Sequence, residues 1–207
     1  MKKLLFAFSM IAMFAYAPAW CSGLDDLQNF FDNTQSFSAR FTQEVFDDDK
    51  KLLESSSGNF IIARPGRFRW HYELPSEQLI IGDGLQVWIY DVELEQATHR
   101  KSANAIAGTP AMLLSGKGEL EKNFQLEELE PQQGMERVRM LPRQTDAGFT
   151  EIVAAFSNGL LKTILLRDSL GHTTRISLSN ITEDIEIKEN TFSFDPPEGV
   201  DVIREGE

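Results

Sequence analysis

The chain has 207 residues, a formal net charge of −12 at pH 7 and a sequence pI near 4.7. Phosphate groups repel a surface this acidic, which argues against nucleic-acid binding, and anionic lipid headgroups repel it in the same way. Cys21 is the only cysteine, so we expect no internal disulfide and a fold that its core alone stabilises.

The first residues have the pattern of a secretory signal peptide. Lys2 and Lys3 precede an apolar run from Leu4 to Ala17, and small residues follow it. The run is short for a membrane span, since a spanning helix needs about 20 apolar residues. The pattern therefore predicts export, with cleavage after Ala19 or after Cys21.

Cys21 also raises the possibility of a lipid anchor. Trp20, however, stands where a lipid-attachment signal has Gly or Ala. We therefore expect a signal peptide over residues 1–21 and a single unacylated domain over residues 22–207. A lipid-anchored protein is the alternative.

The first predicted element after the signal peptide is a helix over Leu24–Asn33. Leu24, Leu27, Phe30 and Phe31 recur at spacings of three and four and form one apolar stripe on an otherwise acidic helix.

Most of the remaining elements are predicted strands. Alternating apolar and polar residues, separated by turn signals such as Pro65-Gly66 and Asn158-Gly159, predict a mainly β fold. The predicted strands are Phe37–Val45, Gly58–Ala63, Arg67–Glu73, Leu79–Ile81, Leu85–Asp91, Gln125–Leu129, Arg137–Leu141, Phe149–Phe156, Leu160–Arg167, Arg175–Leu178 and Phe192–Phe194. Many short strands of this kind indicate one curved antiparallel sheet or an incomplete β-barrel.

Aromatic residues occupy every second position of two of these strands. Phe68, Trp70 and Tyr72 share one face of the first, and Trp88 and Tyr90 share one face of the second. A face this apolar is either covered by a core or lines a cavity for an apolar ligand.

A second, short helix is predicted over residues 109–115. Thr109 suits the N-cap and Pro110 suits the first helical position. The helix lies in a segment of small residues, Ser102–Gly118, between the two halves of the predicted sheet. It is either a lid over the aromatic face or, with the first helix, a permanent part of the core.

Catalytic chemistry finds little support in the sequence. His71, His99 and His172 are scattered without metal-ligand spacing, and no G-x-S-x-G elbow is present. The acidic run 47–49 lacks the remaining residues of a calcium loop. We expect neither an enzyme nor a cofactor, and an exported enzyme acting on lipids or glycans is the weakest hypothesis.

Six motifs follow one another along the chain: RPGRFRWHY at 64–72, QLIIGDG at 78–84, VWIYD at 87–91, QAT at 96–98, TPAMLL at 109–114 and FSFDPPEGV at 192–200. Together they resemble the LolA family of periplasmic outer-membrane lipoprotein carriers of Gram-negative bacteria. The resemblance implies an incomplete β-barrel closed by an α-helical lid over an apolar cavity for lipoprotein acyl chains. It also implies a monomer with two partners, an inner-membrane ABC transporter that loads the carrier and an outer-membrane receptor that unloads it. A lipid-anchored acceptor of the same fold is the alternative function.

The resemblance also implies residue roles. Arg64 corresponds to a latch that holds the lid shut, which suits a guanidinium with five donors in a planar fork; the alternative is a surface arginine that caps a turn. The residues expected to line the lipid cavity are Phe37, Phe68 at its mouth, Trp70 in its wall, Trp88 and Tyr90. The residues expected to form the lid are Leu27, Phe31, Met112, Leu113 and Leu114.

Overall fold

The computed structural model describes residues 22–101, 109–116, 120–144 and 148–205, with the side chain of Met112 left out. The helices are α1 (Gly23–Asn33), α2 (Pro110–Ser115) and α3 (Leu120–Asn123). The strands are β1 (Ser36–Phe46), β2 (Leu52–Ala63), β3 (Arg67–Leu74), β4 (Gln78–Asp83), β5 (Val87–Asp91), β6 (Gln96–Arg100), β7 (Phe124–Gln132), β8 (Met135–Pro142), β9 (Glu151–Ser157), β10 (Leu160–Arg167), β11 (Thr173–Glu183) and β12 (Asp201–Glu205).

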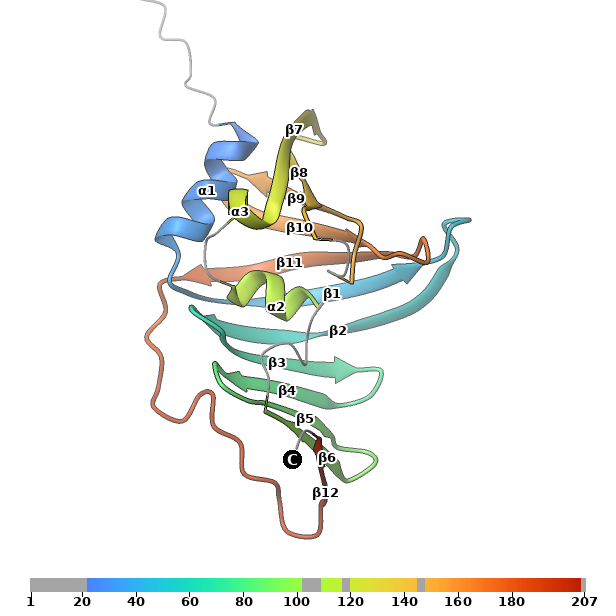
Figure 1. The fold of residues 1–207 in the computed structure, drawn as a ribbon, viewed down its shortest axis with the longest axis vertical. Coiled ribbons are helices and arrows are strands. Elements are labelled where there is room, and N and C mark those ends of the chain that lie inside the picture. The colour runs from blue at the N-terminus through green and yellow to red at the C-terminus, as the bar shows by residue number, and fades with distance from the viewer. Residues whose placement is uncertain (1–21, 102–108, 117–119, 145–147, 206–207) are drawn as a thin grey trace, which may run out of the picture.

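All the described strands belong to one 12-stranded sheet. Its order is β12-β6-β5-β4-β3-β2-β1-β11-β10-β9-β8-β7, and each neighbouring pair is antiparallel except β6 and β12, which are parallel. The sheet is curved and does not close on itself, because β12 and β7 remain its two end strands (Figure 1). The prediction of an incomplete antiparallel β-barrel with helices is therefore confirmed.

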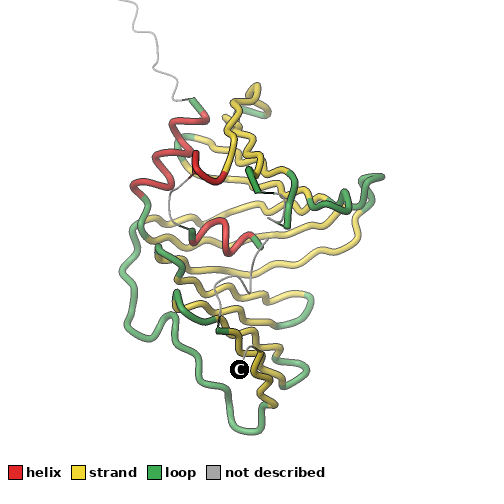
Figure 2. Tube along the Cα trace, viewed as in Figure 1, coloured by secondary structure: helices red, strands yellow, loops and turns green. Residues whose placement is uncertain are grey.

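The helices lie against the inner face of this sheet (Figure 2). α1 packs on β7–β10, and α2 packs on β2 and β3. α1 begins where Ser22 and Asp25 form a capping box, in which each side chain accepts a hydrogen bond from the other residue's backbone N–H. The apolar stripe that the sequence predicts is buried, with Leu27, Phe30 and Phe31 among the least exposed side chains.

The turns follow the local sequence closely. Asn158 and Gly159 have φ angles of 51° and 78° and join β9 to β10 in the predicted hairpin. Both central residues of such a turn need positive φ, which asparagine and glycine adopt most readily. Local chemistry alone therefore determines this connection.

Three features of the fold differ from the prediction. Phe192–Phe194 is not a strand, because its aromatic rings pack side-on against the outer face of the sheet and Pro196-Pro197 follows closely. The last strand is instead β12, which pairs with β6, and neither of these strands was predicted. α3 is a single turn that the pattern also did not indicate.

Gly58 lies where β2 approaches β3 most closely. The pairing of the two strands shifts register between Ser57 and Gly58, and a Cβ atom on Gly58 would overlap the backbone carbonyl oxygen of His71 on β3. Glycine in a strand interior often marks such a close approach of two backbones.

We predict that Gly58→Ala lowers the free energy of unfolding by about 2–3 kcal/mol, because backbone cannot move aside as a flexible side chain can. Chemical denaturation monitored by circular dichroism measures the change. The matched control is Ser57→Ala, on the other face of the same strand, which should shift stability by less than about 0.5 kcal/mol. Equal transition midpoints for the two variants would show that the β2–β3 approach is not tight.

Candidate functional site

An aromatic wall covers the inner face of the sheet. Trp70 of β3 stacks on Phe60 of β2, with ring centroids 4.6 Å apart, and Phe41 of β1 lies 4.8 Å from Trp70. Phe37 meets Phe60 edge to face at 5.3 Å. The strand alternation predicts this arrangement correctly, because the inward residues of β1, β2 and β3 are neighbours on the same face of adjacent strands.

The five residues predicted to line a cavity do not lie in one place in the structure. Trp70, Phe37 and Phe68 are all buried, but only Trp70 borders the open cavity, and Phe37 packs against Phe30 of α1. Phe68 is not at the cavity mouth, which is a correction. It lies at the start of β3, and its ring packs over Gly82 of β4. Tyr72, near the other end of β3, lines the cavity instead.

Trp88 and Tyr90 require a second correction, since they lie on the outer face of the sheet. Both rings pack against Phe194 of the C-terminal segment, at centroid distances of 5.5 and 5.4 Å. The inner face of β5 is formed by Val87 and Ile89, which belong to the core. Alternation predicts that Trp88 and Tyr90 share a face, but either face of this apolar strand could be the inner one.

The interior between the helices and the sheet is filled. Leu27 and Phe31 of α1 meet Leu113 and Leu114 of α2 there, above apolar residues of β8–β10. About 10 Å³ of space remains among them, which is room for at most one water molecule. The predicted lid residues are thus brought together, except that the side chain of Met112 lies outside the described part of the structure.

Arg64 connects both helices to the sheet. It follows β2, its backbone N–H donates to Gln35 O at 2.8 Å, and its side chain is buried. The guanidinium donates from Nη1 to the carbonyl oxygens of Phe30 (2.7 Å) and Thr34 (2.5 Å), and from Nε to that of Leu114 (3.0 Å). These acceptors lie at the C-terminal ends of α1 and α2, where helix carbonyls have no intrahelical partner.

The charge of Arg64 is also placed favourably. No basic residue lies in the last turn of α1, so the guanidinium supplies the positive charge that a helix C-terminus favours. Its central carbon lies 4.5 and 4.6 Å from the ring centroids of Phe30 and Phe31, in the range of cation–π contacts. Burial lowers the pKa of Arg64 to about 10, partly opposed by Glu183, so the group is still charged at neutral pH.

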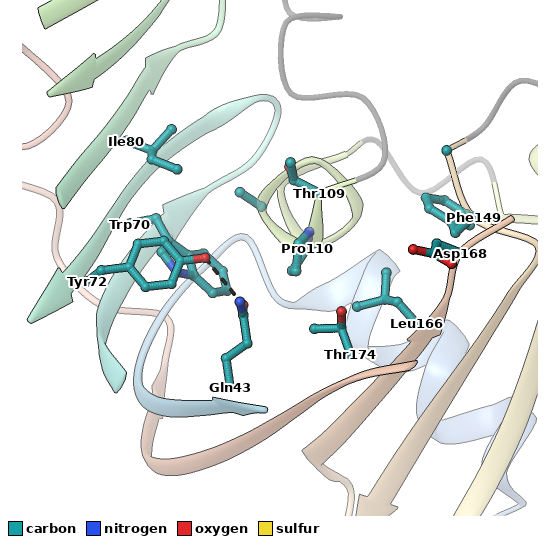
Figure 3. Close-up of a pocket in the computed structure, with 12 residues that line it drawn as sticks. Gln43, Trp70, Tyr72, Ile80, Thr109, Pro110, Phe149, Leu166, Asp168 and Thr174 are labelled. Carbon is teal, nitrogen blue, oxygen red and sulfur yellow. Dashed lines mark hydrogen bonds between the residues drawn. The ribbon is translucent and has the colours of Figure 1, made fainter. Parts of the chain in front are cut away.

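An open cavity of about 370 Å³ lies beside the N-terminal end of α2 (Figure 3). Ligand pockets commonly start near this size. Its lining residues come from β1, β3, β4, β10, β11, the start of α2, the segment before β9 and the turn after β10: Gln43, Trp70, Tyr72, Ile80, Thr109, Pro110, Ala111, Gly148, Phe149, Leu166, Asp168 and Thr174. Sequence reasoning selected only Trp70 from this set, although strand alternation places Gln43 on the same face as Phe37 and Phe41.

The described residues offer little for metal or proton-transfer chemistry. No group of three His, Cys, Asp or Glu side chains among them could hold a metal ion. The histidines lie apart, and each contacts a neighbour of its own: Glu77 for His71, Gln86 for His99 and Asp168 for His172. Within the same ranges, no helix has the length and apolar character that crossing a bilayer requires.

Comparisons with known proteins agree with this geometry. The family model of the outer membrane lipoprotein carrier protein LolA matches residues 32–195. Outer-membrane lipoprotein carrier proteins of Dechloromonas aromatica and Nitrosomonas europaea are 40% and 36% identical to the chain. Each match extends over 206 residues and covers 99% of this chain. It covers 97% of the Dechloromonas aromatica protein and 100% of the Nitrosomonas europaea protein.

Solved structures show the same fold at low sequence identity. A LolA superfamily protein from Nitrosomonas europaea superposes with a TM-score of 0.50 at 11% identity, over 83% of this chain and 96% of that protein. The sequence relatives span nearly the whole chain. The chain therefore belongs to the LolA family of outer membrane lipoprotein carrier proteins.

Proposed function

We propose that this protein carries lipoproteins across the periplasm by enclosing their acyl chains between the helices and the inner face of the sheet. The observation that supports this most directly is the apolar interior under α1 and α2, with one buried arginine that donates hydrogen bonds to both helices. Membership of a family of lipoprotein carriers supports it independently. An inner-membrane ABC transporter as the donor and an outer-membrane receptor as the acceptor belong to the same proposal.

The energetics explain why such a protein would need a movable cover. Burial of each CH₂ group is worth about 0.8 kcal/mol, so a long acyl chain is disfavoured in water by roughly 10 kcal/mol. In the closed form only about 10 Å³ is left between the two helices and strands β8–β10. An acyl chain can enter only if the helices withdraw Leu and Phe side chains from the same space. Cargo burial and helix burial therefore compete, and transfer stays close to neutral in free energy.

α2 is the shorter of the two helices and is the better candidate for the moving part. Gly66 N–H donates to Ser115 O at 2.7 Å and Arg64 donates to Leu114 O, and both contacts lie at one end of the helix. α1 is held at both ends, because Gly23 N–H donates to Glu128 Oε1 at 2.9 Å at its start. Its other end receives the two bonds from Arg64.

We predict that Arg64→Leu shifts the protein toward the open form, in which cargo is accepted but handed on poorly. Hydrogen bonds from a charged group contribute about 1.5–3 kcal/mol each, so loss of even one changes the open population roughly tenfold or more. A transfer assay with purified lipoprotein, carrier and receptor measures the accumulation of loaded carrier. Arg64→Lys should rescue only in part, because lysine has the charge without the planar fork. Equal hand-over by wild type and both variants would remove Arg64 from the mechanism.

Ile80 offers a direct test of the cavity. It is half-buried, lines the open cavity from β4 and pairs with Trp70 of β3. We predict that Ile80→Glu weakens binding of a fluorescent acyl probe more than tenfold, because the carboxylate would have to lose its water beside the acyl chain. Leu79→Glu, on the opposite face of the same strand, is the matched control and should leave binding within about twofold. Similar losses in both variants would place the acyl site elsewhere.

We also propose that the exported protein is unacylated, with its signal peptide removed after Ala19 or Cys21. Mass spectrometry of the protein purified from the producing cell should give an N-terminus at Trp20 or Ser22 without added mass. A diacylglycerol mass on Cys21 would instead identify the lipid-anchored acceptor of the same fold.

A further inference from the structure

One wall of the open cavity is polar. The Tyr72 hydroxyl donates to Gln43 Oε1 at 3.3 Å, and both side chains lie beside Trp70 (Figure 3). Burial raises the pKa of Tyr72 to about 12, against smaller opposing effects of Gln43 and Trp70, so the hydroxyl keeps its proton at neutral pH. The contact therefore orients the Gln43 amide from one side.

Two polar atoms near this contact are buried without hydrogen bonds. They are Nε1 of Trp70 and Oγ of Ser56, neither of which has a hydrogen-bond partner among the described residues. Ser56 pairs directly with Gln43 across β1 and β2, so its side chain is on the same face. Leaving such a group unsatisfied costs about 1–3 kcal/mol, and buried groups of this kind usually have a partner.

The polar wall contrasts with the deeper interior, where every lining residue is apolar. On the other side of the cavity, the carboxylate of Asp168 is already engaged by its own loop. Oδ1 of Asp168 accepts the backbone N–H groups of Leu170 (2.8 Å) and His172 (2.9 Å), and Oδ2 lies 3.2 Å from His172 Nδ1. The donor group of the Gln43 amide therefore suits a ligand group that accepts hydrogen bonds.

The charge of the cavity decides which acceptor fits. None of the described lining residues is a lysine or arginine, and Asp168 is the one charged group in the lining that the structure describes. A fatty-acid carboxylate or a lipid phosphate would lose water there without gaining a cation, which is costly. A neutral ester or amide carbonyl needs only one or two N–H donors.

We propose that the side-chain amide of Gln43 binds the ester or amide carbonyls through which acyl chains are joined to the cargo. This inference rests on the proposed carrier function and adds a basis for selectivity. The hydrocarbon part of each chain occupies the apolar interior, and its carbonyl end stays at the polar wall. Neutral acylated peptides are thereby preferred over phospholipids and free fatty acids with the same chains.

The test compares two synthetic lipopeptides with identical chains, one a diacylglyceryl cysteine peptide with ester linkages and the other its ether-linked analogue. Displacement of a fluorescent acyl probe gives both dissociation constants for the full-length mature protein. The wild type should prefer the ester form by roughly tenfold, the size expected for one or two hydrogen bonds. Gln43→Leu should bring this ratio close to one, and Tyr72→Phe should lower it in part because Gln43 loses its orienting contact.

Thr42→Val is the matched control, because Thr42 is the exposed neighbour of Gln43 on the other face of β1; it should keep the tenfold ratio. Thermal unfolding followed by circular dichroism confirms that each variant is folded. If Gln43→Leu disturbs packing, Tyr72→Phe still tests the inference, because it retains the aromatic ring. A ratio of one in the wild type, or an unchanged ratio in both wall variants, overturns the inference. Binding of neither lipopeptide by the wild type would contradict the carrier function itself, whereas equal binding of both contradicts only the carbonyl site.

Discussion

The closed arrangement depends on the buried guanidinium of Arg64. A single side chain satisfies carbonyls at the ends of α1 and α2, and these helices are otherwise joined to the sheet mainly by apolar packing. Burial lowers the pKa of the group, so removing it from water is unfavourable by itself. The three carbonyl acceptors and the faces of Phe30 and Phe31 offset that penalty only when both helices are in place. One charged group thereby connects the C-terminal ends of both helices.

The sheet carries a separate apolar cluster on each face. The inner cluster, built around Phe60 and Trp70, meets the helices and borders the open cavity. The outer cluster, built around Trp88 and Phe194, attaches the C-terminal segment to β5, and β12 then extends the sheet beside β6. Because the outer cluster is covered by the chain itself, the sheet can keep its inner face for a ligand without exposing a large apolar surface on both sides.

A carrier must bind apolar cargo and still release it, and the same residues serve both needs in this fold. Leu114 and Phe31 fill the interior and cover the apolar wall, and in the proposed mechanism they compete with cargo for the same space. The polar wall around Gln43 and Tyr72 adds a weaker and more specific contact at the cavity edge. Hydrocarbon burial gives most of the affinity and little selectivity. A few hydrogen bonds add little affinity but distinguish one ligand from another.

The sequence by itself determined what depends on neighbouring residues: the helix after Ser22, the Asn158-Gly159 hairpin, and the alternation that puts Phe68, Trp70 and Tyr72 on one face. It also contains the motifs of the family, which the comparisons confirm. Only the tertiary structure decided that Trp88 faces outward, because both faces of β5 are apolar and its pairing with β4 selects between them. The partners of Arg64 lie 30 to 50 residues away, and no local pattern encodes contacts that form only when distant helices dock.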